Sequence, residues 1–157
     1  MVCAPLDSCH DAGVCDPGSG ICSNPNKTDG TACNDADPTT CNDVCATGVC
    51  AGTSVPQPPE IDGSVRLAKN PTDTTITWTD VGGPYNAYRG TIGRPWTFGQ
   101  TCFSSNLGSA STVDAAVPSV GAGFYYLVSR MDQCRESSLG TYGTGAERPN
   151  TSPCPLP

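Results

Sequence analysis

The hydrophobic and polar positions of the chain follow two different patterns on either side of a short proline-rich segment. From Val65 onward, apolar and polar residues alternate over short stretches bounded by turn residues, as in antiparallel β-strands. Before residue 53 no helical or alternating pattern is sustained, and turns such as Asp16-Pro17-Gly18 recur. The pattern therefore predicts a loop-rich N-terminal part and an all-β C-terminal part.

The C-terminal part contains several stretches that are typical of strands. The segment from Thr74 to Trp78 alternates cleanly and should place Ile76 and Trp78 on one face. The most apolar stretch, 124–128, is expected to lie centrally in its sheet. Further strands are expected at 65–67, 85–89, 111–113 and 139–142, with an irregular stretch between residues 90 and 110. Short strands separated by turns at this spacing favour a β-sandwich.

Cysteine residues explain how the loop-rich part can be held together. Eight of the eleven cysteines precede residue 53, where the sizeable hydrophobic side chains besides Met1 are only Val2, Leu6, Val14, Ile21, Val44 and Val49. So few side chains cannot offset the entropy of ordering this segment, whereas disulfides contribute roughly 2–4 kcal/mol each. We expect disulfides at Cys3, Cys9, Cys15, Cys22, Cys33, Cys41, Cys45, Cys50, Cys102, Cys134 and Cys154. The odd number predicts an intermolecular bridge or a free thiol.

A metal cluster is the competing interpretation of these cysteines. Zinc sites usually contain two closely spaced ligand pairs, but the sequence has no Cys-x-x-Cys pair, and His10 is its single histidine. Disulfides are therefore favoured, and they persist in oxidising surroundings, which predicts an extracellular or cell-surface protein. No apolar run approaches the length of a membrane span. Because the chain starts without a secretory signal, we expect that a signal was removed or that a longer polypeptide was cut.

The pattern divides the chain into three segments. Residues 1–52 form the cysteine-rich, disulfide-stapled module, and residues 65–157 form the β-sandwich with its C-terminal tail. Between them, residues 53–64 hold three prolines within four positions, which favours an extended and semi-rigid linker. The predicted fold class is mostly β.

The charge of the chain is strongly uneven. Residues 1–52 hold seven Asp and one Lys, a net charge of −6, and the remaining residues account for −1 of the total of −7. An acidic protein without a basic stripe is a poor ligand for nucleic acid or for an anionic membrane. We therefore expect neither nucleic-acid binding nor membrane insertion.

Several stretches carry a resemblance to a known class of domains. They are RLAKN (66–70), TTITWT (74–79), YNAYRG (85–90) and the long run GFYYLVSRMDQCRESSLGTYGTGAERP (123–149). This set resembles fibronectin type III-like domains near the C-termini of secreted bacterial proteins. LDSCHDAGVCDP (6–17) and KTDGTACND (27–35) are similar to the disulfide-rich segments that precede such domains. The resemblance implies a fibronectin type III-like or immunoglobulin-like β-sandwich but little about activity, and Arg135 stands where the cysteine loop usually has Gly.

Residues that would support catalysis are scarce. His10 lies between Cys9 and Asp11 in the cysteine-rich module, where a surface or packing role is favoured over a catalytic one. No serine lies in a Gly-x-Ser-x-Gly motif, and a small stapled module leaves no room for a cleft between paired carboxylates. We therefore expect a protein that is not an enzyme and that requires no cofactor.

Oxygen-bearing side chains in the cysteine-rich module suggest a calcium site. Calcium prefers six to eight oxygen ligands, and turn-rich Asp/Asn loops supply them from side chains and carbonyls. The alternative, which we favour, is that these side chains cap turns through Asx hydrogen bonds. The candidate residues are Asp29, Asn34, Asp35, Asp37, Asn42 and Asp43.

Sugar attachment and sugar binding are both possible in such a protein. Asn26-Lys27-Thr28 and Asn150-Thr151-Ser152 are acceptor sequons for N-glycosylation. The aromatic residues Trp96, Phe98 and Phe103 form a candidate binding surface for carbohydrate, although we favour a packing role in which they close one end of the sandwich.

These observations lead to two expected functions. The first is a structural subunit of an extracellular filament or matrix whose partners are other copies of the same chain. Contacts would use the linker or the tail as a strand added to a neighbouring sheet, or a bridge through Cys3 or Cys154. The alternative is an adhesion or carbohydrate-binding module of a larger secreted protein, with cell-surface glycans as partners.

Overall fold

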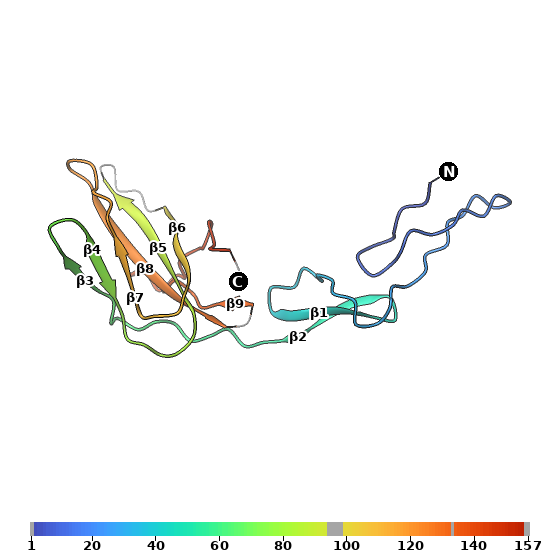
Figure 1. The fold of residues 1–157 in the computed structure, drawn as a ribbon, viewed down its shortest axis with the longest axis horizontal. Helices are drawn as coiled ribbons and strands as arrows, with labels where there is room; N and C mark the ends of the chain where they lie inside the picture. Colours follow the sequence, from blue (N-terminus) through green and yellow to red (C-terminus); the bar gives the residue numbers. More distant parts are fainter. Residues whose placement is uncertain (1, 94–98, 133, 156–157) are drawn as a thin grey trace. The chain divides into compact units, whose positions relative to one another are not determined.

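The structure is a computed structural model, and it describes residues 2–93, 99–132 and 134–155 (Figure 1). All regular elements in these residues are β-strands. The described residues contain no helix long and apolar enough to cross a membrane. Contacts divide the chain into two compact units, Met1–Pro56 (unit 1) and Gln57–Pro157 (unit 2). The mostly β fold predicted from the sequence is confirmed at this level.

Unit 1 contains an antiparallel hairpin of β1 (Thr40–Ala46) and β2 (Val49–Ser54). Its turn residues Thr47 and Gly48 both have positive φ, at 51° and 83°, as in the two-residue turns that suit the twist of a hairpin. Loops alone were predicted here, and that prediction was wrong. Apart from Val44 and Val49, these strands contain only cysteine, Ala, Gly and polar residues, so the hydrophobic alternation by which strands are recognised is missing.

Disulfides connect the hairpin to the preceding loops. Cys9 is bonded to Cys45 in β1, Cys33 is bonded to Cys50 in β2, and Cys3 is bonded to Cys22. Buried Cys41 is disulfide-bonded as well. The Sγ atom of Cys15 lies 3.7 Å from the carbonyl oxygen of Asp16, a thiol hydrogen bond where we had expected a disulfide.

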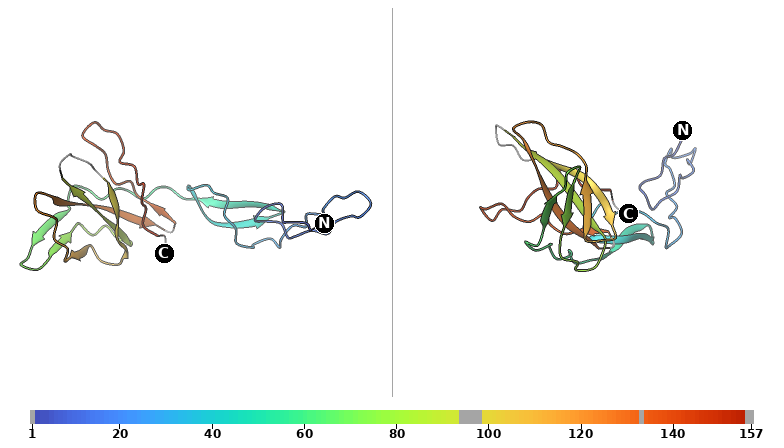
Figure 2. Two further views of the ribbon diagram at one scale, coloured as in Figure 1. Left: turned by 90° about the horizontal axis from the view of Figure 1, so that it is seen from above. Right: turned by 60° about the vertical axis from the view of Figure 1, so that its left-hand side comes forward.

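Unit 2 contains two antiparallel sheets, seen from two further sides in Figure 2. The three-stranded sheet has the order β3-β4-β7, formed by β3 (Arg66–Lys69), β4 (Thr74–Thr77) and β7 (Ser111–Asp114). The four-stranded sheet has the order β6-β5-β8-β9, formed by β5 (Tyr85–Ile92), β6 (Gln100–Leu107), β8 (Gly123–Asp132) and β9 (Arg135–Glu136). The apolar stretch predicted to be central lies within β8, between β5 and β9.

The core of unit 2 joins residues from both sheets. Ile76 and Trp78 pack with Tyr85 and Val128, and the rings of Trp78 and Tyr85 meet edge to face with centroids 5.4 Å apart. The predicted common face of Ile76 and Trp78 is confirmed, since both side chains are buried. These contacts supply to unit 2 the hydrophobic burial that unit 1 lacks.

Two sequence predictions fail within unit 2. The segment from Gln100 to Leu107 forms β6 rather than an irregular stretch, and its polar composition concealed the strand. The expected closing strand at 139–142 is absent from the described residues. Leu139 instead packs in a second core cluster beside Tyr88, and Arg135–Glu136 forms the short edge strand β9.

The C-terminal tail is covalently tied to unit 2. Cys154 is bonded to Cys102 in β6, and the Cys154 backbone N–H donates to Tyr88 Oη over 3.0 Å. Cys134 is also disulfide-bonded. Because Cys3 and Cys154 both form intrachain disulfides, the intermolecular bridge that we considered through them is not supported.

Candidate functional site

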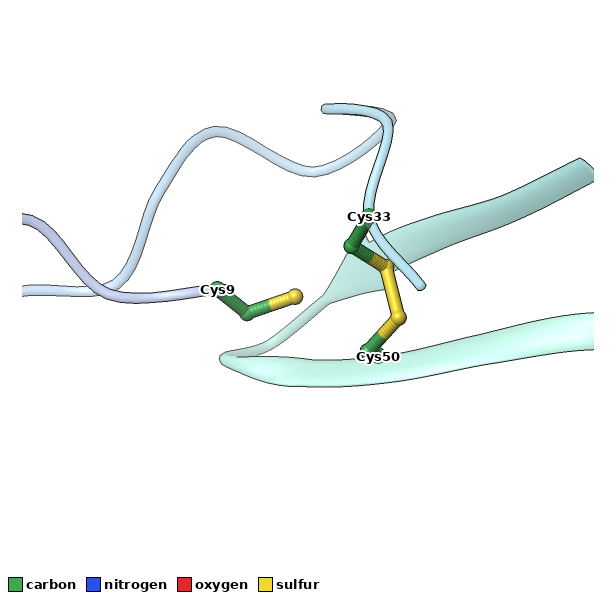
Figure 3. Close-up of side chains that lie close together, drawn as sticks. All are labelled: Cys9, Cys33 and Cys50. Carbon is green, nitrogen blue, oxygen red and sulfur yellow. A yellow bond between two sulfur atoms is a disulfide. The ribbon is translucent and has the colours of Figure 1, made fainter. Parts of the chain in front are cut away.

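Several sulfur atoms of unit 1 lie close together. The Sγ atoms of Cys9, Cys33 and Cys50 all lie within 4.8 Å of one another (Figure 3). We call Cys9, Cys45, Cys33 and Cys50 the sulfur cluster, because two neighbouring disulfides bring these atoms together. Metal sites use thiolates, and a disulfide sulfur is not one, so the oxidised cluster is a structural staple rather than a metal centre.

Burial differs sharply between the two disulfides of the sulfur cluster. Cys9 and Cys45 are 1% and 0% exposed, whereas Cys33 and Cys50 are only partly buried. The buried hydrophobic residues described in unit 1 are all cysteines, namely Cys3, Cys9, Cys41 and Cys45. Disulfides therefore occupy the place that a hydrophobic core holds in a larger domain.

The acidic loop before β1 is organised by local hydrogen bonds. The side-chain oxygens of Asn34, Asp35 and Asp37 each accept a backbone N–H from two residues further on, over 2.7, 2.9 and 2.8 Å. These are Asx turns, the role that we favoured for these residues. The hydrogen bond from the Asp37 backbone lowers the pKa of the Asp35 carboxyl.

The other candidate calcium ligands are only partly brought together. Asp43 Oδ2 accepts the Asp35 backbone N–H over 3.1 Å, so these two acids are neighbours. Asp29 Oδ1 instead accepts the backbone N–H of Thr47 over 2.7 Å, in the hairpin turn, and Asn42 is exposed with a φ of 55°. All of the candidate residues except Asn42 thus have one side-chain oxygen that accepts a backbone N–H, and calcium binding stays a prediction.

The single histidine is paired with an acid. His10 Nδ1 lies 2.7 Å from Asp7 Oδ1, and this hydrogen bond lowers the pKa of the Asp7 carboxyl. The Cys9 backbone N–H donates to the same Asp7 oxygen over 2.8 Å. His10 thus stabilises a turn beside a disulfide.

Unit 2 contains a hydrogen-bond network around the partly buried carboxylate of Glu136, which the sequence analysis missed. Glu136 Oε1 accepts Asn86 Nδ2 over 2.9 Å and Tyr88 Oη over 2.6 Å, and the Ser129 hydroxyl donates to it as well. Asn150 Nδ2 donates to Glu136 Oε2 over 3.0 Å. Burial and the bond to Glu136 raise the pKa of Tyr88 to about 12. No local motif signals the network, because its members come from β5, β8, β9 and the tail.

A polar cavity of about 440 Å³ adjoins this network. Its walls come from Gln57, from residues 136–139 and from residues 147–150. Its lining residues are Gln57, Glu136, Ser137, Ser138, Leu139, Glu147, Arg148, Pro149 and Asn150. The guanidinium carbon of Arg148 lies 4.8 Å from the ring centroid of Tyr142, which places a cation and an aromatic ring in the same segment. Hydroxyl, amide and charged groups together suit a polar ligand.

The two sequons occupy different environments. Asn26 is exposed, and its amide lies against Gly48, where an added Cβ would be 2.6 Å from Asn26 Oδ1. Asn150 is partly buried, and its Nδ2 donates to Tyr88 Oη over 2.9 Å as well as to Glu136. N-linked sugars are attached at Nδ2, so in unit 2 the attachment atom of Asn150 is engaged in hydrogen bonds.

Of the candidate aromatic surface, Trp96 and Phe98 lie outside the described residues. Phe103 is half-buried and packs inside unit 2, with the guanidinium carbon of Arg89 5.2 Å from its ring centroid and Tyr126 in an edge contact at 6.1 Å. Arg89 also forms an ion pair of 2.8 Å with buried Asp114. Although burial opposes ionisation, the hydrogen bond from Arg89 contributes to a lowered pKa of the Asp114 carboxyl.

No family model matches this chain, and neither curated proteins nor solved structures contain a match.

Proposed function

We propose that the chain is a non-enzymatic extracellular structural protein that associates with other copies of itself in a filament or matrix. The multiple disulfides suggest an oxidising, extracellular environment. The observation that carries the proposal is the exposure of aliphatic side chains in unit 1.

These side chains are large and solvent-facing although the module is small. Val2, Leu6, Val14 and Ile21 are 97%, 66%, 78% and 69% exposed. Val14 and Ile21 flank the backbone bridge between Cys15 and Cys22. Large apolar side chains that are left in solvent favour contact with another protein surface, and we propose a second copy of the chain as that partner.

For unit 2 we propose a fibronectin type III-like β-sandwich that serves as a spacer and assembly unit. Its three-stranded and four-stranded antiparallel sheets contribute residues to one core, as such sandwiches require. Strand β3 is an edge strand with all four residues exposed, including Arg66 and Lys69. An edge strand offers unpaired backbone groups, and its two cations suit a strongly acidic partner such as unit 1 of another copy.

The experiment measures self-association of the oxidised full-length chain. Sedimentation velocity over a range of concentrations, with electron microscopy of the same samples, should show growth of oligomers. Replacing Val14 and Ile21 with Ser should weaken association about tenfold or more, because it removes apolar contact area. The matched control replaces Val117 and Val120 of unit 2, which are 77% and 107% exposed, with Ser and should leave association unchanged. A monomer at every concentration, or equal effects of both variants, would contradict the proposal.

A second candidate function is carbohydrate binding, which the polar cavity beside Glu136 favours. A sugar presents hydroxyl groups to just such a mixture of amides, hydroxyls and charges. A glycan array would identify ligands, and Arg148→Ala should weaken their binding about tenfold or more through loss of hydrogen bonds. Arg66→Ala, an exposed arginine on β3, is the control, and equal binding by both variants would rule the cavity out.

A further inference from the structure

The sulfur cluster contains one sheltered disulfide and one accessible disulfide in close contact. We infer that small-molecule thiols enter unit 1 at the Cys33–Cys50 disulfide and that the exchange then passes internally to the buried Cys9–Cys45 disulfide. The proposal assigns a thiol-modification site to Cys33 and Cys50. It concerns the chemistry of a single chain and does not depend on self-association.

Direct attack on the buried bond is disfavoured by access. A thiolate must reach a sulfur atom to exchange with it, and Cys9 and Cys45 are 1% and 0% exposed. Cys33 and Cys50 are partly exposed, so an external thiolate can approach them first. Within the sulfur cluster, thiol–disulfide exchange therefore begins at Cys33–Cys50.

The internal step follows from proximity. Cys9 Sγ lies within 4.8 Å of both Cys33 Sγ and Cys50 Sγ, and Figure 3 shows its side chain directed toward their bond. Whichever of the two cysteines leaves as thiolate is therefore already beside the next sulfur that it can attack. Groups held at such distances react as if at high effective concentration.

The two steps balance as ordinary exchange. A small thiolate RS⁻ attacks Cys50 Sγ, which forms the mixed disulfide RS–Cys50 and releases the Cys33 thiolate. The Cys33 thiolate attacks Cys9 Sγ, forms a Cys9–Cys33 disulfide and releases the Cys45 thiolate, which takes a proton from water. Attack at Cys33 gives the counterpart products, RS–Cys33 and Cys9–Cys50. The number of disulfides is conserved, so no further oxidant or reductant is needed.

The test traps this rearrangement in the oxidised full-length chain. The protein is treated with limiting reduced glutathione, quenched with acid, alkylated with N-ethylmaleimide and mapped by peptide mass spectrometry. We expect glutathione on Cys50 or Cys33, a new Cys9–Cys33 or Cys9–Cys50 linkage, and the alkyl label on Cys45. Alkylation of Cys9 and Cys45 without either new linkage at any time would overturn the proposal.

Variants supply a second measurement. In Cys33→Ser/Cys50→Ser, opening of Cys9–Cys45 by glutathione should slow about tenfold or more, because the entry point is gone. Cys3→Ser/Cys22→Ser removes a disulfide of the same unit outside the cluster and should leave the new linkages in place. Loss of the linkages in this control would overturn the proposal, because it would assign their formation to the overall order of unit 1. If the first variant loses its fold, the linkage trapped in the unmodified chain decides.

Discussion

The regular elements described in unit 1 and unit 2 are all β-strands, but the two units are stabilised in different ways. In unit 1 the buried hydrophobic residues described are cysteines, and the large aliphatic side chains Val2, Leu6, Val14 and Ile21 face solvent. In unit 2 aromatic and aliphatic side chains from two sheets fill a core, and the hydrogen-bond network around Glu136 joins the sheet to the tail. Covalent links can therefore take the place of a hydrophobic core in a small unit.

The largest expected effect comes from reducing all disulfides. Unit 1 should unfold, because its disulfides contribute roughly 2–4 kcal/mol each and little hydrophobic burial remains. Unit 2 should keep protected amides in β5 and β8, since its core persists. Hydrogen exchange of the reduced chain, read by mass spectrometry, checks this. Equal protection of the amides of both units from exchange would show that unit 1 does not depend on its disulfides more than unit 2 does.

A core substitution should act on unit 2 alone. Ile76→Ala should lower its free energy of unfolding by about 2–5 kcal/mol through lost burial and a cavity. Leu67 is the cross-strand neighbour of Ile76 and is 52% exposed, so Leu67→Ala is the matched control with a change below about 1 kcal/mol. Denaturant unfolding measures both, and similar losses would show that the described core is not the stabilising one.

Alkaline pH should lower the stability of unit 2 more than that of unit 1, because all five tyrosines lie in unit 2. Burial and the bond to Glu136 raise the pKa of Tyr88 to about 12, and burial and Asp114 do the same for Tyr126. A raised folded-state pKa gives stability that is complete below the unfolded value, about 10, and is lost as pH rises toward 12.

Denaturant unfolding of unit 2 between pH 9 and 12, together with ultraviolet titration of the phenols, checks this loss. Glu136→Gln should lower the pKa of Tyr88 and leave that of Tyr126 unchanged. If the two phenols shift together in this variant, the assignment of Tyr88 to the Glu136 network is wrong.

The smallest expected effect concerns the acidic loop of unit 1. Asp37→Ala removes the acceptor for the Thr39 backbone N–H and should lower the free energy of unfolding by about 0.5–1.5 kcal/mol. Asp37→Asn keeps a side-chain oxygen and should restore most of that stability. A calcium site would respond differently, with both variants losing whatever stabilisation added calcium provides over EDTA. Thermal unfolding with calcium and with EDTA distinguishes the two roles.

How far the sequence predicted the molecule depended on hydrophobic alternation. β4 and β8 were found because Ile76, Trp78 and the 124–128 stretch follow strand patterns. β1, β2 and β6 were missed because cysteines and polar residues fill them. In these strands disulfides contribute stability that an apolar face would otherwise provide. Hydrophobic periodicity in the sequence therefore does not reveal such strands.

The candidate sites were predicted unevenly for a similar reason. Asx turns at Asn34 and Asp35 are local, so sequence spacing was enough to suggest them. The Glu136 network and the sulfur cluster depend on residues that are distant in the chain, such as Asn86 with Glu136 and Cys9 with Cys50. Pairing of this kind is decided by the folded backbone, and eight cysteines alone allow 105 pairings.

The hydrogen bonds of Asn150 make glycosylation at this sequon depend on whether the sugar is transferred before or after the C-terminal tail docks. Its Nδ2 donates to Tyr88 and Glu136 in the folded unit, where the tail is docked and Cys154 is bonded to Cys102. If a cell transfers sugars to the chain, a glycan at Asn150 must arrive before that docking and would then keep the tail away from the network. Asn26 is exposed and can accept a sugar before or after the tail docks. The ratio of glycan occupancy at Asn150 to that at Asn26 would therefore compare the rate of tail docking with the rate of sugar transfer.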